Sequence, residues 1–161
     1  MKIGRITVSD RASAGIYEDR SGPEIERILR QLFGDTTQFC AAVVPDEAAG
    51  ISAALREMAD REQCEVILTT GGTGITARDV TPEATRAVLD RELPGFGEVM
   101  RAESMKITRN AILSRNLAAV VDRTLVICLP GKPSGAVECL GFVVGAIPHC
   151  VEVLQEVPTS C

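Results

Sequence analysis

TTGGTGITARDVTPEAT, residues 69–85, is the stretch that decides how this chain folds. The residues that lead into it, Glu65 to Thr70, are rich in β-branched side chains and predict a strand. Three glycines then precede Asp79, and Thr81 with Pro82 predicts the N-cap and first position of a helix. The stretch therefore predicts a strand, a glycine-rich loop and a helix in immediate succession.

Strands and helices alternate on both sides of this stretch. We predict strands at 2–9, 39–44, 65–70, 117–121 and 125–129. We predict helices at 23–33, 45–60, 81–91, within 93–107 and at 136–147, with a break or kink at Pro148 and a last helical turn or two after it. Such alternation is typical of an α/β fold, a three-layer α/β/α sandwich with a mostly parallel central sheet. We expect one domain over residues 1–161.

The composition of the chain limits which kinds of partner it is expected to bind. The chain has 161 residues and a net charge of −5, which argues against nucleic acid and anionic membranes. The N-terminus is too short and polar for a secretory signal, and we expect no apolar stretch near the roughly 18–20 residues of a membrane span. Six cysteines without a C-x-x-C pair favour reduced, mostly buried thiols in a cytoplasmic protein over disulfides. His149 is the single histidine, which argues against zinc and favours a packing or surface role for that residue.

Most residues capable of chemistry follow the predicted strands. In a parallel sheet, ligands bind beyond the carboxyl ends of the strands. Four such ends hold Ser9-Asp10-Arg11, Pro45-Asp46-Glu47, Gly71 to Asp79, and Pro130 to Ser134. This coincidence predicts a single site at one edge of the sheet.

The glycine loop, residues 71–79, is compatible with more than one interpretation. A strand, a glycine turn and a helix start suit phosphate binding. Residues 72–77 fit G-x-G-x-x-A, but a dinucleotide fingerprint opens a helix at once, whereas Arg78, Asp79 and Pro82 intervene here. A Walker loop is disfavoured because its G-K-[ST] ending is missing. A purely structural turn, with Asp79 bonding its own backbone, remains open on these residues alone.

Taken together, the strand-end segments resemble the MogA-type molybdopterin adenylyltransferase family, which includes the gephyrin G domain. The matching segments are SDRASAGIYEDRSGP (9–23), VPDE (44–47), LTTGGTGITARDVTPEAT (68–85), PGFGEVMR (94–101), AILSR (111–115) and LPGKP (129–133). The resemblance implies one molybdopterin-binding domain. It also implies a reaction in molybdenum cofactor biosynthesis, in which the terminal phosphate of molybdopterin attacks the α-phosphate of ATP, with Mg²⁺ present, and releases pyrophosphate.

The resemblance further implies a homotrimer, small-molecule substrates and a downstream molybdenum-insertion enzyme as a possible partner. A phosphate nucleophile is already anionic near neutral pH, so carboxylates would act on the metal and not on protons. Asp46 and Asp79 end two different strands and are the expected catalytic metal ligands, since Mg²⁺ takes oxygen ligands and keeps waters. Without the resemblance, Asp46 is better explained as a cap of the helix that follows it.

The remaining candidates are expected to bind nucleotide or pterin. Backbone and hydroxyl donors would come from the glycine loop, and the turn after the strand at 125–129 would enclose the nucleotide. The candidates are Ser9, Asp10, Arg11, Thr70, Gly71, Gly72, Thr73, Gly74, Arg78, Ser114, Arg115, Pro130, Gly131 and Lys132. Arg78 is expected to pair with Asp79 or with substrate, and Lys132 to meet phosphate charge or to remain an exposed lysine. The rival hypothesis from another class is a non-catalytic pterin-binding or scaffold module of the same fold.

Overall fold

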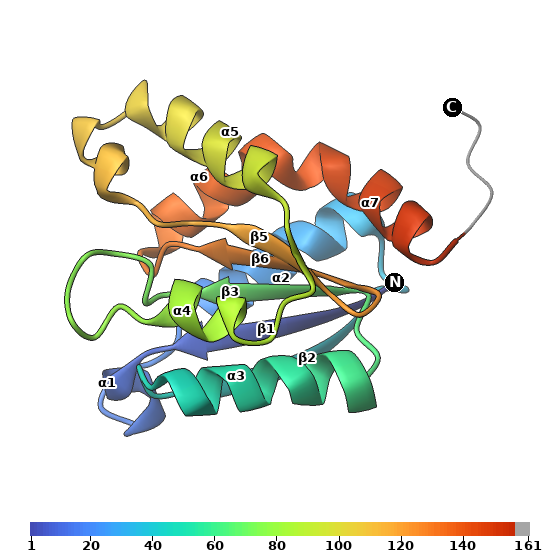
Figure 1. Cartoon of the computed structure of the whole chain (residues 1–161), viewed down its shortest axis with the longest axis horizontal. Coiled ribbons are helices and arrows are strands. Elements are labelled where there is room, and N and C mark those ends of the chain that lie inside the picture. Colours follow the sequence, from blue (N-terminus) through green and yellow to red (C-terminus); the bar gives the residue numbers. More distant parts are fainter. Residues whose placement is uncertain (157–161) are drawn as a thin grey trace.

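The computed structural model describes residues 1–156 and contains one six-stranded sheet between two layers of helices (Figure 1). The sheet order is β2-β1-β3-β6-β5-β4. Its strands are β1 (Lys2–Val8), β2 (Gln38–Val44), β3 (Val66–Thr70), β4 (Arg91–Glu92), β5 (Ala118–Val121) and β6 (Thr124–Leu129). β2, β1, β3 and β6 are parallel, whereas β5 runs antiparallel to both β6 and β4. The predicted three-layer sandwich with a mostly parallel sheet is confirmed.

Helices cover both faces of the sheet. The helical segments are α1 (Asp10–Ser13), α2 (Ser21–Phe33), α3 (Ala48–Arg56) with a π-helical extension η1 (Glu57–Arg61), α4 (Thr81–Arg86), α5 (Pro94–Met105), the 3₁₀ turn η2 (Arg109–Leu113), α6 (Pro133–Val143), the 3₁₀ turn η3 (Val144–Ala146) and α7 (Ile147–Leu154). Figure 1 shows α2, α5, α6 and α7 above the sheet and α3 and α4 below it. The carboxyl ends of β1, β3 and β6 point to the left of that view, where α1 and the glycine loop also lie.

Alternation along the strands divides the apolar side chains between two cores. In β1, Ile3 packs with α2, α6 and α7, whereas Ile6 packs with α3 and α4. The same division holds in β6, where Leu125 and Ile127 face one layer and Val126 the other. β3 and β6 are buried along their whole length, and they are apolar except at Thr69, Thr70 and Thr124, in keeping with parallel strands that are covered on both faces.

Several element boundaries differ from the sequence-based prediction. Thr81 is not the N-cap of α4: Val80 holds that position, and the Thr81 hydroxyl donates to the Gly71 carbonyl at 2.8 Å. The helix also ends at Arg86 and not near Arg91, because the chain turns there into the short strand β4. The segment between the predicted strand 2–9 and the predicted helix 23–33 contains α1, which is capped by the Ser9 hydroxyl, an acceptor from Ala12 N at 3.2 Å. Tertiary contacts therefore outweighed the local start signal at Thr81.

The C-terminal helical segment corrects one expectation. Pro133–Leu154 is continuous enough, and apolar enough at a mean hydropathy of 1.7 over 18 residues, to cross a membrane by length and composition alone. The expectation that no apolar stretch approaches that length was therefore wrong. In the structure one stripe of α6 and α7, including Leu140 and Ile147, packs into the core of the upper layer. The break lies in η3, at 144–146, and Pro148 occupies the first turn of α7.

The expected burial of the cysteines is seen for three of the five that are described. Cys64, Cys128 and Cys139 are buried, Cys40 and Cys150 are half-buried, and all five are free thiols. Cys161 lies outside the described residues. His149 is exposed, and its Nδ1 lies 3.8 Å from a carboxylate oxygen of Glu152, which agrees with a surface role.

Candidate active site at the strand carboxyl ends

Two turns meet where β3 and β6 end. Gly71 N donates to the Leu129 carbonyl at 3.1 Å, and a Cβ on Gly131 would lie 3.2 Å from Gly71 Cα. Gly71 has a φ of 103°, and a Cβ there would lie 2.3 Å from the Val8 carbonyl oxygen. Both the backbone conformation and the close approach of β1 therefore require glycine at the start of the loop.

The glycine loop is held to the helix that follows it. The Thr81 hydroxyl donates to the Gly71 carbonyl, and the Thr81 amide donates to the Gly72 carbonyl at 3.0 Å. Thr81 is fully buried, so these bonds form away from solvent. The loop is thus fixed at its start and cannot open a helix before Thr81, which excludes the dinucleotide fingerprint considered for residues 72–77.

Arg115 closes the other side of the glycine loop. Its Nε donates to the Gly74 carbonyl at 2.6 Å, its Nη2 donates to the Asp79 carbonyl, and its Nη1 pairs with Glu83 on α4. Its backbone amide also donates to the Thr73 carbonyl at 3.0 Å. The guanidinium expected to bind substrate is therefore engaged by the protein itself. Arg115 positions the loop and α4 relative to each other.

Asp79 is both a loop-forming residue and a wall of the main cavity. Its Oδ2 accepts from the amide of Thr76 at 2.8 Å and from the hydroxyl of Thr76 at 2.6 Å. Burial opposes ionisation of this carboxyl, but the two Thr76 bonds, the Gly74 backbone and the nearby positive charge outweigh burial and lower the pKa of Asp79. The local turn anticipated for Asp79 is therefore present, and it holds a carboxylate that is ionised at neutral pH.

The main cavity has a volume of about 450 Å³ and lies between the strand ends, α5 and the start of α6. Its walls combine the glycine loop, the 130–132 turn and the segment from α5 to β5. Eight of the predicted residues line it, namely Gly72, Thr73, Gly74, Asp79, Ser114, Pro130, Gly131 and Lys132. Such a volume is in the range of small-molecule sites.

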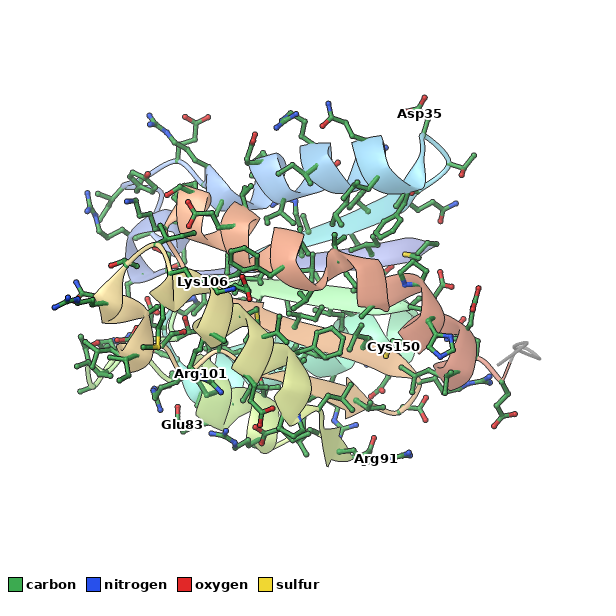
Figure 2. All side chains as sticks on the ribbon, turned by 90° about the horizontal axis from the view of Figure 1, so that it is seen from above. Asp35, Glu83, Arg91, Arg101, Lys106 and Cys150 are labelled. Atoms are coloured by element: carbon green, nitrogen blue, oxygen red, sulfur yellow. The ribbon has the colours of Figure 1, made fainter. Side chains whose placement is uncertain are left out.

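The cavity also contains residues that were not predicted from the sequence. Arg101 on α5 is half-buried and donates from Nη1 to the Asn116 carbonyl at 2.7 Å. Figure 2 shows α5, where Arg101 is labelled, beside α6 above the sheet. Within residues 1–156, no carboxylate lies within ion-pair distance of Arg101 or Lys132. Two cations that line one cavity without a carboxylate partner favour an anionic ligand.

A second network joins the ends of β1 and β2. Asp10 N donates to Asp46 Oδ2 at 2.8 Å, and Asp46 N donates to Asp10 Oδ1 at 3.0 Å. Arg78, from the glycine loop, binds Asp10 with both Nε and Nη2, at 3.0 and 2.7 Å. The bonds from Arg78, and after them the bond from the Asp46 amide, lower the pKa of Asp10. Arg78 therefore pairs with Asp10 and not with the adjacent Asp79.

The carboxylate of Asp46 does not cap the helix that follows it. Glu47 is the N-cap residue of α3 and makes no side-chain cap bond. Asp46 instead binds the first amide of α1 across two loops. The cap explanation offered for this residue is therefore wrong, and its carboxylate lies in the strand-end network.

A smaller cavity of about 120 Å³ lies on the α2 side of the turns, and Ser9, Thr70 and Gly131 are among its lining residues. Arg11, also predicted as a site residue, is exposed and stacks 5.5 Å from the ring centre of Tyr17. Asp10, Asp46, Arg78 and Arg115 line neither this cavity nor the main one. The sequence candidates thus divide into cavity walls and the residues that hold the loops behind them.

Metal binding by protein groups alone is not supported in the part of the chain that is described. No group of three or more His, Cys, Asp or Glu side chains gathers there. Mg²⁺ commonly uses one or two carboxylates and completes its shell with waters and substrate phosphates. The ionised Asp79 on a cavity wall, with unpaired cations nearby, fits such a substrate-completed site.

Comparison with known proteins agrees with this geometry. Residues 4–149 match the family model described as a probable molybdopterin binding domain. Molybdopterin adenylyltransferase from Helicobacter pylori is 47% identical over 152 residues, which cover 94% of this chain and 86% of that protein. The enzyme of the same name from Escherichia coli is 40% identical over 167 residues, covering 96% and 86%.

A solved structure supports the same relationship. The molybdopterin biosynthesis enzyme MoaB of Thermus thermophilus superposes with a TM-score of 0.88 at 42% identity, and the match covers 99% of each chain. The similarity therefore extends over the whole sandwich, including the strand ends that form the cavities.

Proposed function

Because the chain belongs to the molybdopterin-binding domain family that matches residues 4–149, we propose that it is a molybdopterin adenylyltransferase of molybdenum cofactor biosynthesis. The observation that carries this function is identity of 40–47% to enzymes of that name over most of both chains. The non-catalytic binding module is not favoured, since the relatives that match over most of their own length are named as enzymes.

The reaction proposed is transfer of AMP from ATP to molybdopterin. An oxygen of the molybdopterin phosphate attacks the α-phosphorus of ATP, and the bond from that phosphorus to the bridging oxygen of the β-phosphate breaks. Pyrophosphate leaves with that oxygen, and no proton has to be removed from the nucleophile. The protein's task is therefore to align two anions and offset their repulsion.

The main cavity suits this task. Arg101 and Lys132 supply positive charge, and Gly72 of the glycine loop lines the cavity, where its backbone amide is placed to donate to phosphate. The Gly74 backbone is already engaged by the Asp79 carboxylate. Arg115 and Thr81 hold the glycine loop in place before substrate arrives. The energetic gain is preorganisation: the donors do not have to be ordered when charge shifts during transfer.

We propose Asp79 and Asp46 as the residues that hold Mg²⁺. Asp79 lines the main cavity, and Asp46 lies in the adjoining network with Asp10. When bound, the ion would neutralise phosphate charge and orient the reacting groups. The low pKa of Asp79 keeps this ligand ionised at physiological pH.

The direct test is pyrophosphate release from ATP and molybdopterin by the purified chain. We expect release that depends on both substrates and on added Mg²⁺. If molybdopterin still binds, as followed by quenching of the pterin's own fluorescence, but no pyrophosphate is released, the chain would instead be the non-catalytic binding module.

The fall in kcat/KM at low pH should reflect protonation of the substrate and not of a protein group. The second pKa of a phosphate monoester is about 6, so we expect kcat/KM to fall below about pH 6 as the dianionic nucleophile is protonated. Asp79 should not contribute, because its pKa lies below the ordinary value of 3.8. The control is Thr76→Val, which removes a hydroxyl that lowers the pKa of Asp79. If the fall in kcat/KM moves to higher pH in this variant, it reports protonation of Asp79, and the assignment to the substrate phosphate is wrong.

Assembly and location remain proposals. We propose a homotrimer in the cytoplasm that passes adenylylated molybdopterin to a molybdenum-insertion enzyme. Free thiols throughout the described residues are in keeping with a reducing compartment. Light scattering of the purified chain tests the trimer, and a monomeric mass would contradict it.

A further inference from the structure

Two thiols outside the site are in contact. The Sγ atoms of Cys40, in β2, and Cys64, just before β3, lie 3.1 Å apart. β1 lies between these two strands in the sheet, so the thiols meet over β1. The residue of β1 paired with Cys40 is Gly4. The contact thus joins residues that are 24 positions apart in the sequence and belong to different elements.

Gly4 makes room for this contact. A Cβ on Gly4 would lie 3.3 Å from Cys64 Sγ and 2.6 Å from Met58 Sδ. Any side chain there would have to displace one or both sulfur groups. The glycine in a buried strand is therefore explained by the sulfur atoms packed above it.

We propose that Cys40 and Cys64 form a reversible intrachain disulfide when the protein meets hydrogen peroxide or a small-molecule disulfide. The sulfurs need to close from 3.1 Å to about 2.0 Å. β2 is an edge strand and Cys40 is half-buried, whereas Cys64 is only 2% exposed. Cys40 is therefore the thiol that an oxidant reaches, and Cys64 is the one that resolves it. The inference does not depend on the proposed function.

The peroxide reaction balances in two steps. The Cys40 thiolate takes one oxygen from hydrogen peroxide, giving a sulfenic acid and hydroxide. The Cys64 sulfur then attacks the Cys40 sulfur, the S–O bond breaks, and the departing oxygen leaves as water with the Cys64 proton. In sum, two thiols are oxidised and one peroxide is reduced to two waters. With a small-molecule disulfide, the Cys40 sulfur attacks one of its sulfurs, the S–S bond breaks, and one small thiol leaves from the mixed disulfide that forms. The Cys64 sulfur then attacks the Cys40 sulfur, and the second small thiol leaves with the Cys64 proton. Burial, followed by the bond to Cys40, raises the pKa of Cys64, which keeps this thiol from being the first to react.

The other described thiols have no such neighbour. Cys128 contacts the Thr85 hydroxyl at 3.3 Å, and Cys139 contacts the Ser104 hydroxyl at 3.6 Å. Within residues 1–156, Cys40 and Cys64 are the one pair of cysteines whose sulfur atoms are in contact. The disulfide should therefore form at this pair, before any thiol is oxidised to a sulfinic or sulfonic acid.

The experiment is oxidation of the full chain by peroxide, and separately by oxidised glutathione, followed by intact mass and non-reducing peptide mapping. We expect loss of two hydrogen atoms, a cross-linked peptide pair containing Cys40 and Cys64, and full reversal by dithiothreitol. In Cys64→Ser, peroxide should instead add one to three oxygens at Cys40. Cys40→Ser, at a half-buried edge position, should abolish the cross-link with the least disturbance of the core.

Matched controls separate this pair from the other thiols. Cys150→Ser changes a half-buried thiol on α7 (Figure 2), which packs with the core on the opposite face of the sheet, and should leave the cross-link intact. Cys161→Ser should also leave it intact. A wild-type disulfide between any other cysteines, or oxygen added at Cys40 without a cross-link, would overturn the proposal.

Discussion

Asp79→Asn is expected to reduce pyrophosphate release by about a hundredfold or more, which corresponds to roughly 2.7 kcal/mol of transition-state stabilisation. The substitution keeps the shape of the side chain and an oxygen that can accept from Thr76, so the loop should remain in place. It removes the negative charge that we propose for binding Mg²⁺. The loss should therefore appear in turnover, with molybdopterin affinity and the free energy of unfolding nearly unchanged.

The matched control is Asp35→Asn. Asp35 lies between α2 and β2, at the end of the molecule opposite the glycine loop (Figures 1 and 2), and lines none of the cavities described above. Its turnover should equal that of the wild type. Titration of Mg²⁺ distinguishes the causes, because a lost ligand should raise the metal concentration needed for half-maximal rate. Unchanged turnover in Asp79→Asn would rule out the role of Asp79 as a metal ligand.

The fold could be predicted from the sequence because its signals are local and periodic. The β-branched and apolar residues of β3 and β6 and the amphipathic spacing of α2 each predict their element without reference to the others. Thr81 was misassigned because its hydroxyl binds a carbonyl ten residues earlier, a contact that no start signal encodes. β4 was missed because its two exposed residues are a strand only through pairing with β5.

The site was predictable only in part for the same reason. Strand ends located the glycine loop, Asp79 and the 130–132 turn, since parallel topology brings such ends together. Arg101 was missed because it lies in a helix and reaches the cavity through packing of α5 beside α6. The segment PGFGEVMR, which ends at Arg101, carries the family resemblance, and it was the available signal for this residue. The roles of Arg78 and Arg115 depend on partners far away in the sequence.

Among the residues that position the loops, Arg115 is expected to have the largest effect on stability and turnover when it is replaced. Its guanidinium binds the carbonyls of Gly74 and Asp79 and the carboxylate of Glu83, so one side chain ties the middle and the end of the glycine loop to α4. Arg115→Ala leaves those acceptors without their charged donor. We expect the free energy of unfolding to fall by about 2–4 kcal/mol. Turnover should fall by up to roughly a hundredfold, since small shifts of aligned groups are costly.

Denaturant unfolding and pyrophosphate release, measured on the same samples, test this expectation. Arg86→Ala is the matched control, because its exposed pair with Glu92 should contribute no more than about 1 kcal/mol. Arg115→Lys should recover part of the stability but little of the turnover, because one ammonium cannot bind three divergent acceptors. If Arg115 instead bound substrate directly, Arg115→Ala would raise KM while stability stayed at the wild-type value, and the positioning role would be refuted.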